Sequence, residues 1–263
     1  MLARSLDQFF TKPSVALECV KALDAYMSSS INSWLWVEPS AGSGVFFDLM
    51  RHPKIGLDIM SQRADITQTD FLSWHPGTVR RKIAVVGNPP FGKNASLARR
   101  FFDHAASFAD VVAFIVPRTF EKPLFVNRLN RHMHRVHAQI LDECSFEFEN
   151  APYSVPTAFQ IWERRTAVRP LIESVRTHRD FDFVTKPFAD FAFQRVGARA
   201  GLVSLEGLAK SPQSHYFMSA RAPRRTVFDR LRAIDWEPIK HRTAGNPSIG
   251  KGELVAAYRA AHG

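Results

Sequence analysis

The stretch Trp34-Leu35-Trp36-Val37-Glu38-Pro39-Ser40-Ala41-Gly42-Ser43-Gly44 decides the fold, because an apolar run of strand length leads directly into a glycine-containing turn. The residues that follow, 44–50, have the pattern of a helix. Glycine in such a turn lets the backbone approach a ligand closely. By itself the turn is weak evidence for a ligand, since tight strand-to-helix turns often need glycine. The stretch therefore predicts one strand–turn–helix unit of a larger sheet.

Apolar runs of strand length alternate with helical patterns over residues 13–162. The other candidate strands are 54–57, 83–86, 111–116, 136–141 and 158–162, and the other candidate helices are 13–27, 95–106 and 124–132. This alternation is typical of an α/β fold with a largely parallel sheet. Ligands bind such sheets beyond the carboxyl ends of the strands, so we expect the loops after the strands to carry the function.

The composition is that of an ordinary globular protein. The chain has 263 residues, of which 45% are hydrophobic and 23% are charged. This length suggests one large domain, or one domain plus a smaller appendage. No apolar run approaches the ~20 residues that span a bilayer, and residues 1–7 lack the apolar segment of a signal peptide, so we expect a cytoplasmic location and no membrane partner. Cys19 and Cys144 lie far apart in the sequence and are expected to be free thiols.

The charge is strongly basic and unevenly distributed. The net charge is +10, and residues 167–263 carry 16 Lys and Arg against 9 Asp and Glu, which gives +7 for this part. Such an excess favours a polyanionic partner, and a nucleic acid is the preferred one. The alternative is a generically basic surface. We divide the chain into a catalytic domain over 1–166 and a basic C-terminal region over 167–263.

Two further strand ends carry unusual residues. Asp58 follows the strand 54–57, where its carboxylate is placed to accept hydrogen bonds from a pair of ribose hydroxyls, although a solvated carboxylate is equally common at such a position. The strand 83–86 leads into Gly87-Asn88-Pro89-Pro90-Phe91-Gly92-Lys93. The order and spacing of the three strand ends are more specific than any one of them.

The tetrapeptide Asn88-Pro89-Pro90-Phe91 has the chemistry of a site that methylates a planar amino nitrogen. The exocyclic amine of adenine is a poor nucleophile because its lone pair is delocalised into the ring. An amide oxygen from Asn88 and the carbonyl of Pro89, accepting both amine hydrogens, favour the geometry that attacks a methyl sulfonium. The prolines fix φ and remove two backbone donors, and Phe91 is available to stack on the ring. The alternative is a rigid turn after a strand.

With these residues in this order, the chain resembles the S-adenosylmethionine-dependent N6-adenine DNA methyltransferases. Two signatures of that family, acidic-Pro-x-x-Gly-x-Gly and Asn-Pro-Pro-Phe, occur here at 38–44 and 88–91. A third, usually Asp-Gln-Phe-Tyr-Thr, occurs at 7–11 with Phe10 in place of tyrosine. The resemblance covers roughly residues 5–165. It implies a Rossmann-like class I methyltransferase fold with a mostly parallel seven-stranded sheet, followed by a small basic appendage.

The resemblance also implies that S-adenosylmethionine is the cofactor. The turn after the first strand would wrap its methionine part, Asp58 would hold the ribose hydroxyls, and Asp70-Phe71 would contact the adenine. For Asp70-Phe71 the alternative is a helix cap followed by a core phenylalanine. The implied cofactor-binding residues are Gln8, Phe9, Thr11, Glu38, Pro39, Ser40, Ala41, Gly42, Gly44, Asp58, Ile59, Asp70, Phe71 and Asn88.

For the methylated base, the resemblance implies that Asn88, Pro89, Pro90 and Phe91 form the catalytic loop. The substrate-binding residues are then Phe91, the neighbouring Lys93, and Tyr153 on the opposite face of the base, with Phe148 as the rival for that position. A base inside a duplex cannot reach such a pocket, so the enzyme would flip its target out. No general base is needed to start the reaction, because the sulfonium is a strong electrophile.

The C-terminal third has basic segments at 195–201, 221–225 and 240–242, interleaved with aromatic residues. They suit contacts with backbone phosphates and therefore target recognition, although they equally suit solvated loops. The three histidines at 132, 134 and 137 have a spacing that would not converge on a metal, and we expect no metal site.

DNA adenine methylation is the first hypothesis for the function. The alternatives are an RNA adenine methyltransferase, a methyltransferase for protein glutamine, and a catalytically inactive subunit that binds nucleic acid. The glutamine enzymes usually have tyrosine at the position of Phe91, which argues against that alternative. The residues of the two main signatures are intact here, which argues against an inactive subunit. The oligomeric state and the target sequence are left open.

Overall fold

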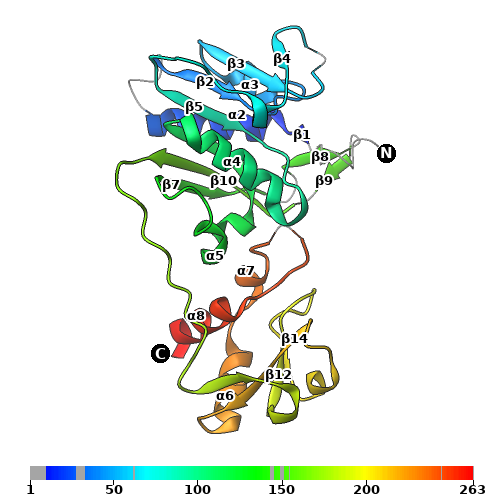
Figure 1. Cartoon of the computed structure of the whole chain (residues 1–263). Helices are drawn as coiled ribbons and strands as arrows, with labels where there is room; N and C mark the ends of the chain where they lie inside the picture. The colour runs from blue at the N-terminus through cyan, green and yellow to red at the C-terminus, as the bar shows by residue number, and fades with distance from the viewer. Residues whose placement is uncertain are drawn as a thin grey trace. The chain divides into compact units, whose positions relative to one another are not determined.

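The computed structural model describes residues 10–27, 33–61, 63–142, 145–148, 151–153, 155–243 and 245–262 (Figure 1). The chain divides into two compact units. The first comprises Met1–Phe120 and Phe125–Leu171, and the second comprises Glu121–Leu124 and Ile172–Gly263. The division therefore lies close to the sequence-based boundary after residue 166. Of the two cysteines, Cys19 is a buried free thiol and Cys144 lies outside the described residues.

The first unit is built on a seven-stranded sheet. In spatial order its strands are β4 (Ile66–Gln68), β3 (Lys54–Asp58), β2 (Leu35–Glu38), β5 (Ile83–Gly87), β6 (Val111–Pro117), β10 (Thr157–Arg164) and β7 (Met133–Ile140). Strand β10 is antiparallel to both of its neighbours, and the pairs from β4 through β6 are parallel. The mostly parallel seven-stranded sheet that the sequence predicts is confirmed.

The central strands are apolar on both sides because helices and loops cover both faces of the sheet. Every residue of β2, β5 and β6 is buried, which is the pattern of a parallel sheet covered on both faces. Helix α4 (Ser96–Phe108) packs on β6, and α3 (Val45–Leu49) contacts both β3 and α2 (Pro13–Met27). Figure 1 shows α4 lying across the sheet. The core thereby holds the ends of β2, β3 and β5 in fixed positions.

One predicted helix is much shorter than expected. The sequence suggested a helix over 124–132, but α5 spans only Pro123–Val126. The chain leaves the helix in two turns, because the N–H of Asn130 donates to Asp103 and the side-chain oxygen of Asn130 accepts from the N–H of His132. These side-chain bonds compete with a continued helical ladder. Strand β7 then begins at Met133, three residues earlier than its predicted start at 136.

A small antiparallel sheet joins the N-terminal part of the first unit to the segment after β7. It consists of β1 (Phe10–Thr11), β8 (Phe146–Phe148) and β9 (Ala151–Tyr153), in the order β1-β8-β9. Phe10 pairs with Glu147, and Thr11 pairs with Phe146. The hydrogen bond from the N–H of Lys12 to the carbonyl of Ser145 extends this pairing. The sheet fixes Phe10 and Thr11 beside the segment that follows β7.

The second unit has a sheet and a hydrophobic core of its own. Its four antiparallel strands have the order β11 (Phe181–Val184), β14 (His215–Ala220), β12 (Phe191–Gln194) and β13 (Val203–Ser204). Helix α6 (Arg224–Ala233) packs on β13, β14 and α8 (Lys251–His262), and α7 (Glu237–Lys240) lies between the two helices in the sequence. The core includes Phe181, Phe191, Phe193, Leu231, Trp236 and Tyr258. The basic region is thus a folded α+β unit, which the sequence patterns did not predict.

Short 3-10 turns complete the described structure, at Phe71–Ser73, Lys93–Ala95, Arg118–Glu121, Lys186–Phe188 and Glu206–Ala209. No helix in the described ranges has both the length and the apolar character needed to cross a bilayer.

Candidate active site

A cleft opens at the carboxyl ends of β2, β3 and β5, where the three unusual strand ends meet. Its empty space, including the part open to solvent, is about 780 Å³. Three segments that lie far apart in the sequence contribute to it, in addition to β1. The lining residues are Phe10, Thr11, Glu38, Ser40, Ala41, Gly42, Ser43, Val45, Phe46, Asp58, Ile59, Asn88, Pro89, Pro90 and Phe91.

The turn after β2 has a backbone conformation that requires glycine at two positions. Gly42 and Gly44 have φ values of 52° and 89°, in the left-handed region that L side chains rarely adopt. A Cβ atom at Gly44 would lie 2.2 Å from Nη1 of Arg63, so a larger residue would have to displace that guanidinium. The two glycines let the turn fold back tightly. Ala41, which precedes them, and Ser43, which lies between them, line the cleft.

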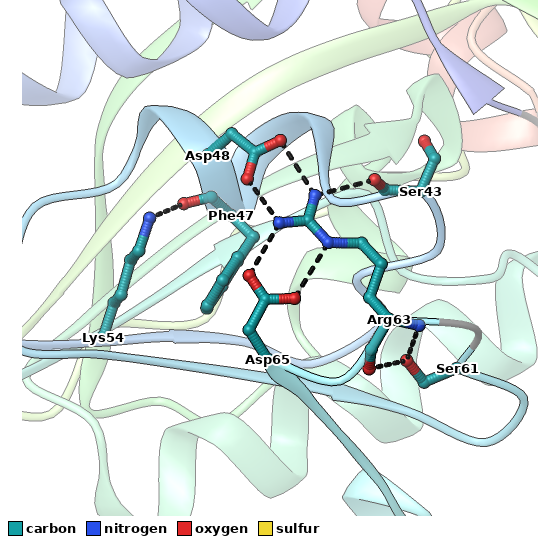
Figure 2. A network of polar contacts seen from close by, with 7 residues as sticks. All are labelled: Ser43, Phe47, Asp48, Lys54, Ser61, Arg63 and Asp65. Atoms are coloured by element: carbon teal, nitrogen blue, oxygen red, sulfur yellow. Dashed lines mark hydrogen bonds and ion pairs between the residues drawn. The ribbon is translucent and has the colours of Figure 1, made fainter.

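Arg63 holds this turn from outside the cleft (Figure 2). Its guanidinium pairs with the carboxylates of Asp48 and Asp65, at 2.8 Å from each, and donates over 3.1 Å to the carbonyl of Ser43. The arginine stands over the ring of Phe47, with Cζ 5.6 Å from the ring centroid. The guanidinium lowers the pKa of both Asp48 and Asp65, which keeps the two carboxylates charged. The turn is therefore fixed by an ion-pair network from α3 and the loop before β4.

Asp58 also supports the turn. One carboxylate oxygen accepts from the N–H of Gly42 over 2.7 Å, and the other accepts from the N–H of Met60 over 2.8 Å. A carboxylate has about four lone-pair sites, so two backbone bonds leave acceptor capacity on the side facing the cleft. Ile59, the next residue, lines the cleft and is 50% exposed. An exposed aliphatic side chain beside an acceptor suits a ligand with an apolar ring and a pair of hydroxyls.

Glu38 places a carboxyl group in the floor of the cleft. The residue is 2% exposed. Burial raises its pKa well above the ordinary value; the N–H of Phe47 opposes this shift, and the nearby carboxylates of Asp58 and Asp48 add to it. Its Oε2 atom is buried without a hydrogen-bond partner among the described residues. An unpartnered buried carboxyl oxygen that lines a cleft is a position at which a ligand donor is favoured.

Asn88 is held from two sides. Its side-chain nitrogen donates over 3.2 Å to the hydroxyl of Thr11, and its main-chain carbonyl accepts over 3.1 Å from the hydroxyl of Ser40. The carbonyl of Pro89 has no hydrogen-bond donor within the described ranges. Asn88 therefore connects the N-terminal strand β1, the turn after β2 and the loop after β5, and the first proline of the loop presents an acceptor.

The rest of the Asn-Pro-Pro-Phe loop is fixed to α4. The carbonyl of Phe91 accepts from the N–H groups of Leu97 and Ala98 over 3.0 and 3.2 Å. Asn94 and Ala95 are left-handed, with φ of 55° and 60°, a conformation that costs of order 1–3 kcal/mol at such residues and clusters at functional sites. The Phe91 ring is 6% exposed. It packs edge-on against Phe146 at 6.5 Å, so it forms a wall of the cleft backed by the small sheet.

Several predicted site residues lie elsewhere. Pro39 and Gly44 belong to the turn but do not line the cleft, and Lys93 is exposed outside it. Asp70 accepts from the N–H of Leu72 and caps the short 3-10 turn, whereas Phe71 is buried against Phe101 and His104. For these two residues the structure matches the alternative, a cap followed by a core phenylalanine. Gln8, Phe9 and the side chains of Phe148 and Tyr153 lie outside the described part of the chain.

Sequence reasoning missed other residues of the site. Val45 and Phe46 line the cleft from α3, and Phe10, which was noted only as a replacement for tyrosine, lines it from β1 with 46% of its surface exposed. Nothing in the sequence marks Arg63, because its role depends on carboxylates from two separate segments. Within the described ranges, no three His, Cys, Asp or Glu side chains converge on a metal position.

Comparison with known proteins gives a consistent but distant picture. No protein-family model and no curated protein sequence matches the chain. Among solved structures, a proposed RNA methyltransferase from Pyrococcus horikoshii aligns at 18% identity over 60% of this chain and 87% of that chain, with a TM-score of 0.49. A proposed class I S-adenosylmethionine-dependent methyltransferase from Listeria monocytogenes aligns at 14% identity over 62% and 64%, with a TM-score of 0.47.

A third similar structure is the methyltransferase subunit of a type I restriction-modification system from Streptococcus thermophilus. It aligns at 16% identity over 63% of this chain and 48% of that chain, with a TM-score of 0.43. Because the TM-scores are below 0.5, we base no functional conclusion on these similarities. The Rossmann-like class I methyltransferase fold itself agrees with the strand order and with the single antiparallel strand β10.

Proposed function

We propose that this chain transfers a methyl group from S-adenosylmethionine to the N6 amine of adenine in DNA. The observation that carries the proposal is the convergence of Asn88, Pro89 and Phe91 with the turn after β2 and with Asp58 in one cleft. A rigid proline turn without function would not need to meet a glycine turn and a strand-end carboxylate. The convergence supports a site with two adjacent parts, one for the cofactor and one for the base.

The residues around the cofactor part fit S-adenosylmethionine. Glu38 offers a buried, unpartnered oxygen to an ammonium or amine donor, Asp58 offers acceptor capacity to ribose hydroxyls, and the exposed Ile59 offers an apolar face to a purine. When bound, the cofactor supplies an electrophilic methyl group on a sulfonium. The glycines at 42 and 44 keep side chains out of the turn, so the backbone contacts the ligand directly.

The residues of the base part act on the amine. The side-chain oxygen of Asn88 and the carbonyl oxygen of Pro89 accept the two amine hydrogens, which concentrates the lone pair on the nitrogen. Phe91 provides a flat apolar wall for the ring. The loop contributes positioning and electrostatics and needs no general base, since the amine becomes acidic only as positive charge develops on it. The amine proton then leaves to water.

The polymer is inferred from charge. The second unit, comprising Glu121–Leu124 and Ile172–Gly263, has 16 Lys and Arg against 10 Asp and Glu, a net charge of +6, which favours a polyanion. A base within a duplex must be extruded to reach the cleft, and a wall such as Phe91 offsets part of the cost of unstacking. This step belongs to the proposal for DNA as the substrate.

Mass spectrometry of nucleosides tests the proposal. The protein is incubated with deuterated-methyl S-adenosylmethionine and, in parallel, with unmethylated genomic DNA, total RNA and a glutamine-containing peptide. We expect labelled N6-methyladenine in DNA. Label in RNA alone would assign the enzyme to the RNA alternative, label in the peptide would assign it to glutamine, and no label anywhere would contradict methyl transfer. The Asn88→Ala variant serves as the negative control.

A further inference from the structure

The second unit has a cavity of its own, with more cationic than anionic side chains in its lining. Four of its lining side chains are cationic and one is a carboxylate, and an aromatic ring, a hydroxyl and the start of α8 complete it. All of these residues belong to the second unit. The lining residues are Lys122, Pro123, Leu124, Ser174, Arg176, Arg195, Tyr216, Gly250, Lys251, Gly252 and Glu253.

The one carboxylate in the cavity is engaged through one of its two oxygens, whereas Oε1 of Glu253 is buried without a hydrogen-bond partner among the described residues. Oε2 of Glu253 accepts from the N–H of Gly250 over 2.8 Å and pairs with Lys122 at 3.3 Å. Lys122 therefore balances Glu253, and the positive charges of Arg176, Arg195 and Lys251 remain. Arg176 and Lys251 are exposed to solvent, and neither has an ion-pair partner among the described residues.

Aromatic rings, not carboxylates, position two of these cations. The Cζ atom of Arg195 stands 5.0 Å from the ring centroid of Tyr216. The Nζ atom of Lys251 stands 4.7 Å from the centroid of Phe183 and 5.6 Å from that of Tyr216. A ring face orients a cation without cancelling its charge. The Nε atom of Arg195 is in addition buried without a hydrogen-bond acceptor within the described ranges, although Nη1 donates to the carbonyl of Gln213.

Three of the other cations that the sequence suggested for phosphate contact are engaged inside the unit. Arg221 pairs with Asp182, and Arg225 pairs with Asp229. Lys240 is buried, pairs with Glu237 and donates to the carbonyl of Ala198. These side chains stabilise the unit itself. Arg195 and Lys251 thus differ from them in having rings as neighbours in place of carboxylates.

We propose that the cavity lined by Arg176, Arg195, Tyr216 and Lys251 binds a backbone phosphate of a nucleic acid. The 12-residue helix α8 begins at Lys251, and its first N–H groups have no carbonyl partner within the helix, so they are available to an anion. The hydroxyl of Ser174 lies close to this helix start, because a Cβ at Gly252 would be 2.1 Å from it. The inference rests on the proposed function in that it takes the polymer to be the methyl acceptor.

Binding measured without turnover tests this site. The anisotropy of a fluorescent DNA duplex is followed in a salt titration with the wild type and with the double variant Arg176→Ala/Lys251→Ala. Each lost phosphate contact reduces the slope of log K against log salt by about one. Because the cavity is proposed to hold one phosphate, we expect a slope that is smaller by about one and an affinity at least tenfold weaker at low salt. A double variant with Arg225→Ala and Arg232→Ala removes the same charge from exposed positions on α6 outside the cavity, and it should keep the slope.

An unchanged slope in the cavity variant, or an equal loss in the α6 variant, would overturn the site. Thermal unfolding verifies that the variants are folded, and Arg176→Ala alone, which removes an exposed side chain, provides the test if the double variant fails to fold.

Calorimetry with inorganic phosphate distinguishes the sources of the anion: wild-type binding of free phosphate as tight as that of the duplex would also contradict a nucleic-acid site. The same titration with single-stranded RNA shows whether the site discriminates between polymers, and an RNA slope that falls in the same way still supports it. A reduced slope together with the absence of methylated nucleosides would contradict the proposed function and leave the phosphate site intact.

Discussion

The side-chain nitrogen of Asn88 donates to the hydroxyl of Thr11 over 3.2 Å, across 77 residues of sequence. This bond turns the amide nitrogen toward β1 and hence the amide oxygen away from it. Thr11 was expected to bind the cofactor. The contact gives it a second role, in which it sets the orientation of the residue that we propose to hold the amine.

Replacing Thr11 with valine therefore should reduce kcat more than it changes the cofactor Kd. The loss of one hydrogen bond corresponds to roughly three- to tenfold in rate, because the amide of Asn88 would no longer be held in one orientation. Thr11→Ser retains the hydroxyl and should restore most of the activity. Steady-state kinetics and calorimetry of cofactor binding check both variants. Equal kcat values for the Thr11→Val and Thr11→Ser variants would contradict the positioning role.

Asn88→Ala should abolish methyl transfer while cofactor affinity stays within a few-fold of the wild type. The change removes the proposed acceptor for the amine but none of the contacts of Asp58 or of the glycine turn. We expect a loss of kcat of at least about 100-fold, the scale seen when one preorganised polar group is removed from an active site. Loss of cofactor binding in parallel with activity would assign Asn88 to the cofactor part instead.

Asp58→Ala should weaken cofactor binding, because the variant loses the ribose acceptor and also the bond that fixes the N–H of Gly42. Asp58→Asn keeps one acceptor oxygen and should be intermediate. The dissociation constant from calorimetry is the measurement. An unchanged affinity in the alanine variant would place the ribose elsewhere in the cleft.

Arg63→Met should also weaken cofactor binding, although Arg63 does not line the cleft. The variant retains the length of the side chain but frees the carbonyl of Ser43 and leaves Asp48 and Asp65 without their shared partner. We expect roughly a three- to tenfold rise in Kd, the size of one lost hydrogen bond. Arg51→Met breaks a comparable exposed pair with Asp24 on α2, and it should leave Kd unchanged. Equal effects in both variants would indicate a general loss of stability.

Glu38 should make stability depend on pH. Burial raises its pKa, so the folded state binds the proton more tightly than the unfolded chain does. Its contribution to stability is therefore complete below the unfolded pKa near 4.5 and is lost as the pH rises through the folded pKa. Glu38→Gln stays neutral, so its free energy of unfolding relative to the wild type should increase with pH. Urea denaturation at several pH values measures this, and a constant difference would contradict a raised pKa.

Much of the first unit could be predicted because its strands are continuous apolar runs. Helix α2 matches its predicted bounds at 13–27, and β2, β3, β5 and β6 lie within one residue of theirs. Strand β4 was missed, since its three residues, with two of them exposed, have no apolar pattern. The small sheet was missed because β1 pairs with β8, which is distant from it in the sequence. The sheet of the second unit was missed because its strands are short and lie among basic loops.

The candidate site was partly predictable for a related reason. Residues that follow strands, such as Asp58 and Asn88, could be identified because parallel strands bring their carboxyl ends together. Partners from other elements could not be identified, and Arg63 and Phe146 are the clearest examples. For Asp70 and Phe71 the sequence was compatible with two interpretations, and only the packing against Phe101 and His104 distinguishes them.

The pairing of β1 with β8 has a consequence for biosynthesis. Phe10 and Thr11 leave the ribosome early, but Phe146, which pairs with Thr11, is made only after β7. A nascent chain that ends before β8 can form β2 through β6 and yet lacks the strand that brings Thr11 to Asn88. The cleft is therefore assembled late in translation, and a partly made chain lacks the contact between Thr11 and Asn88.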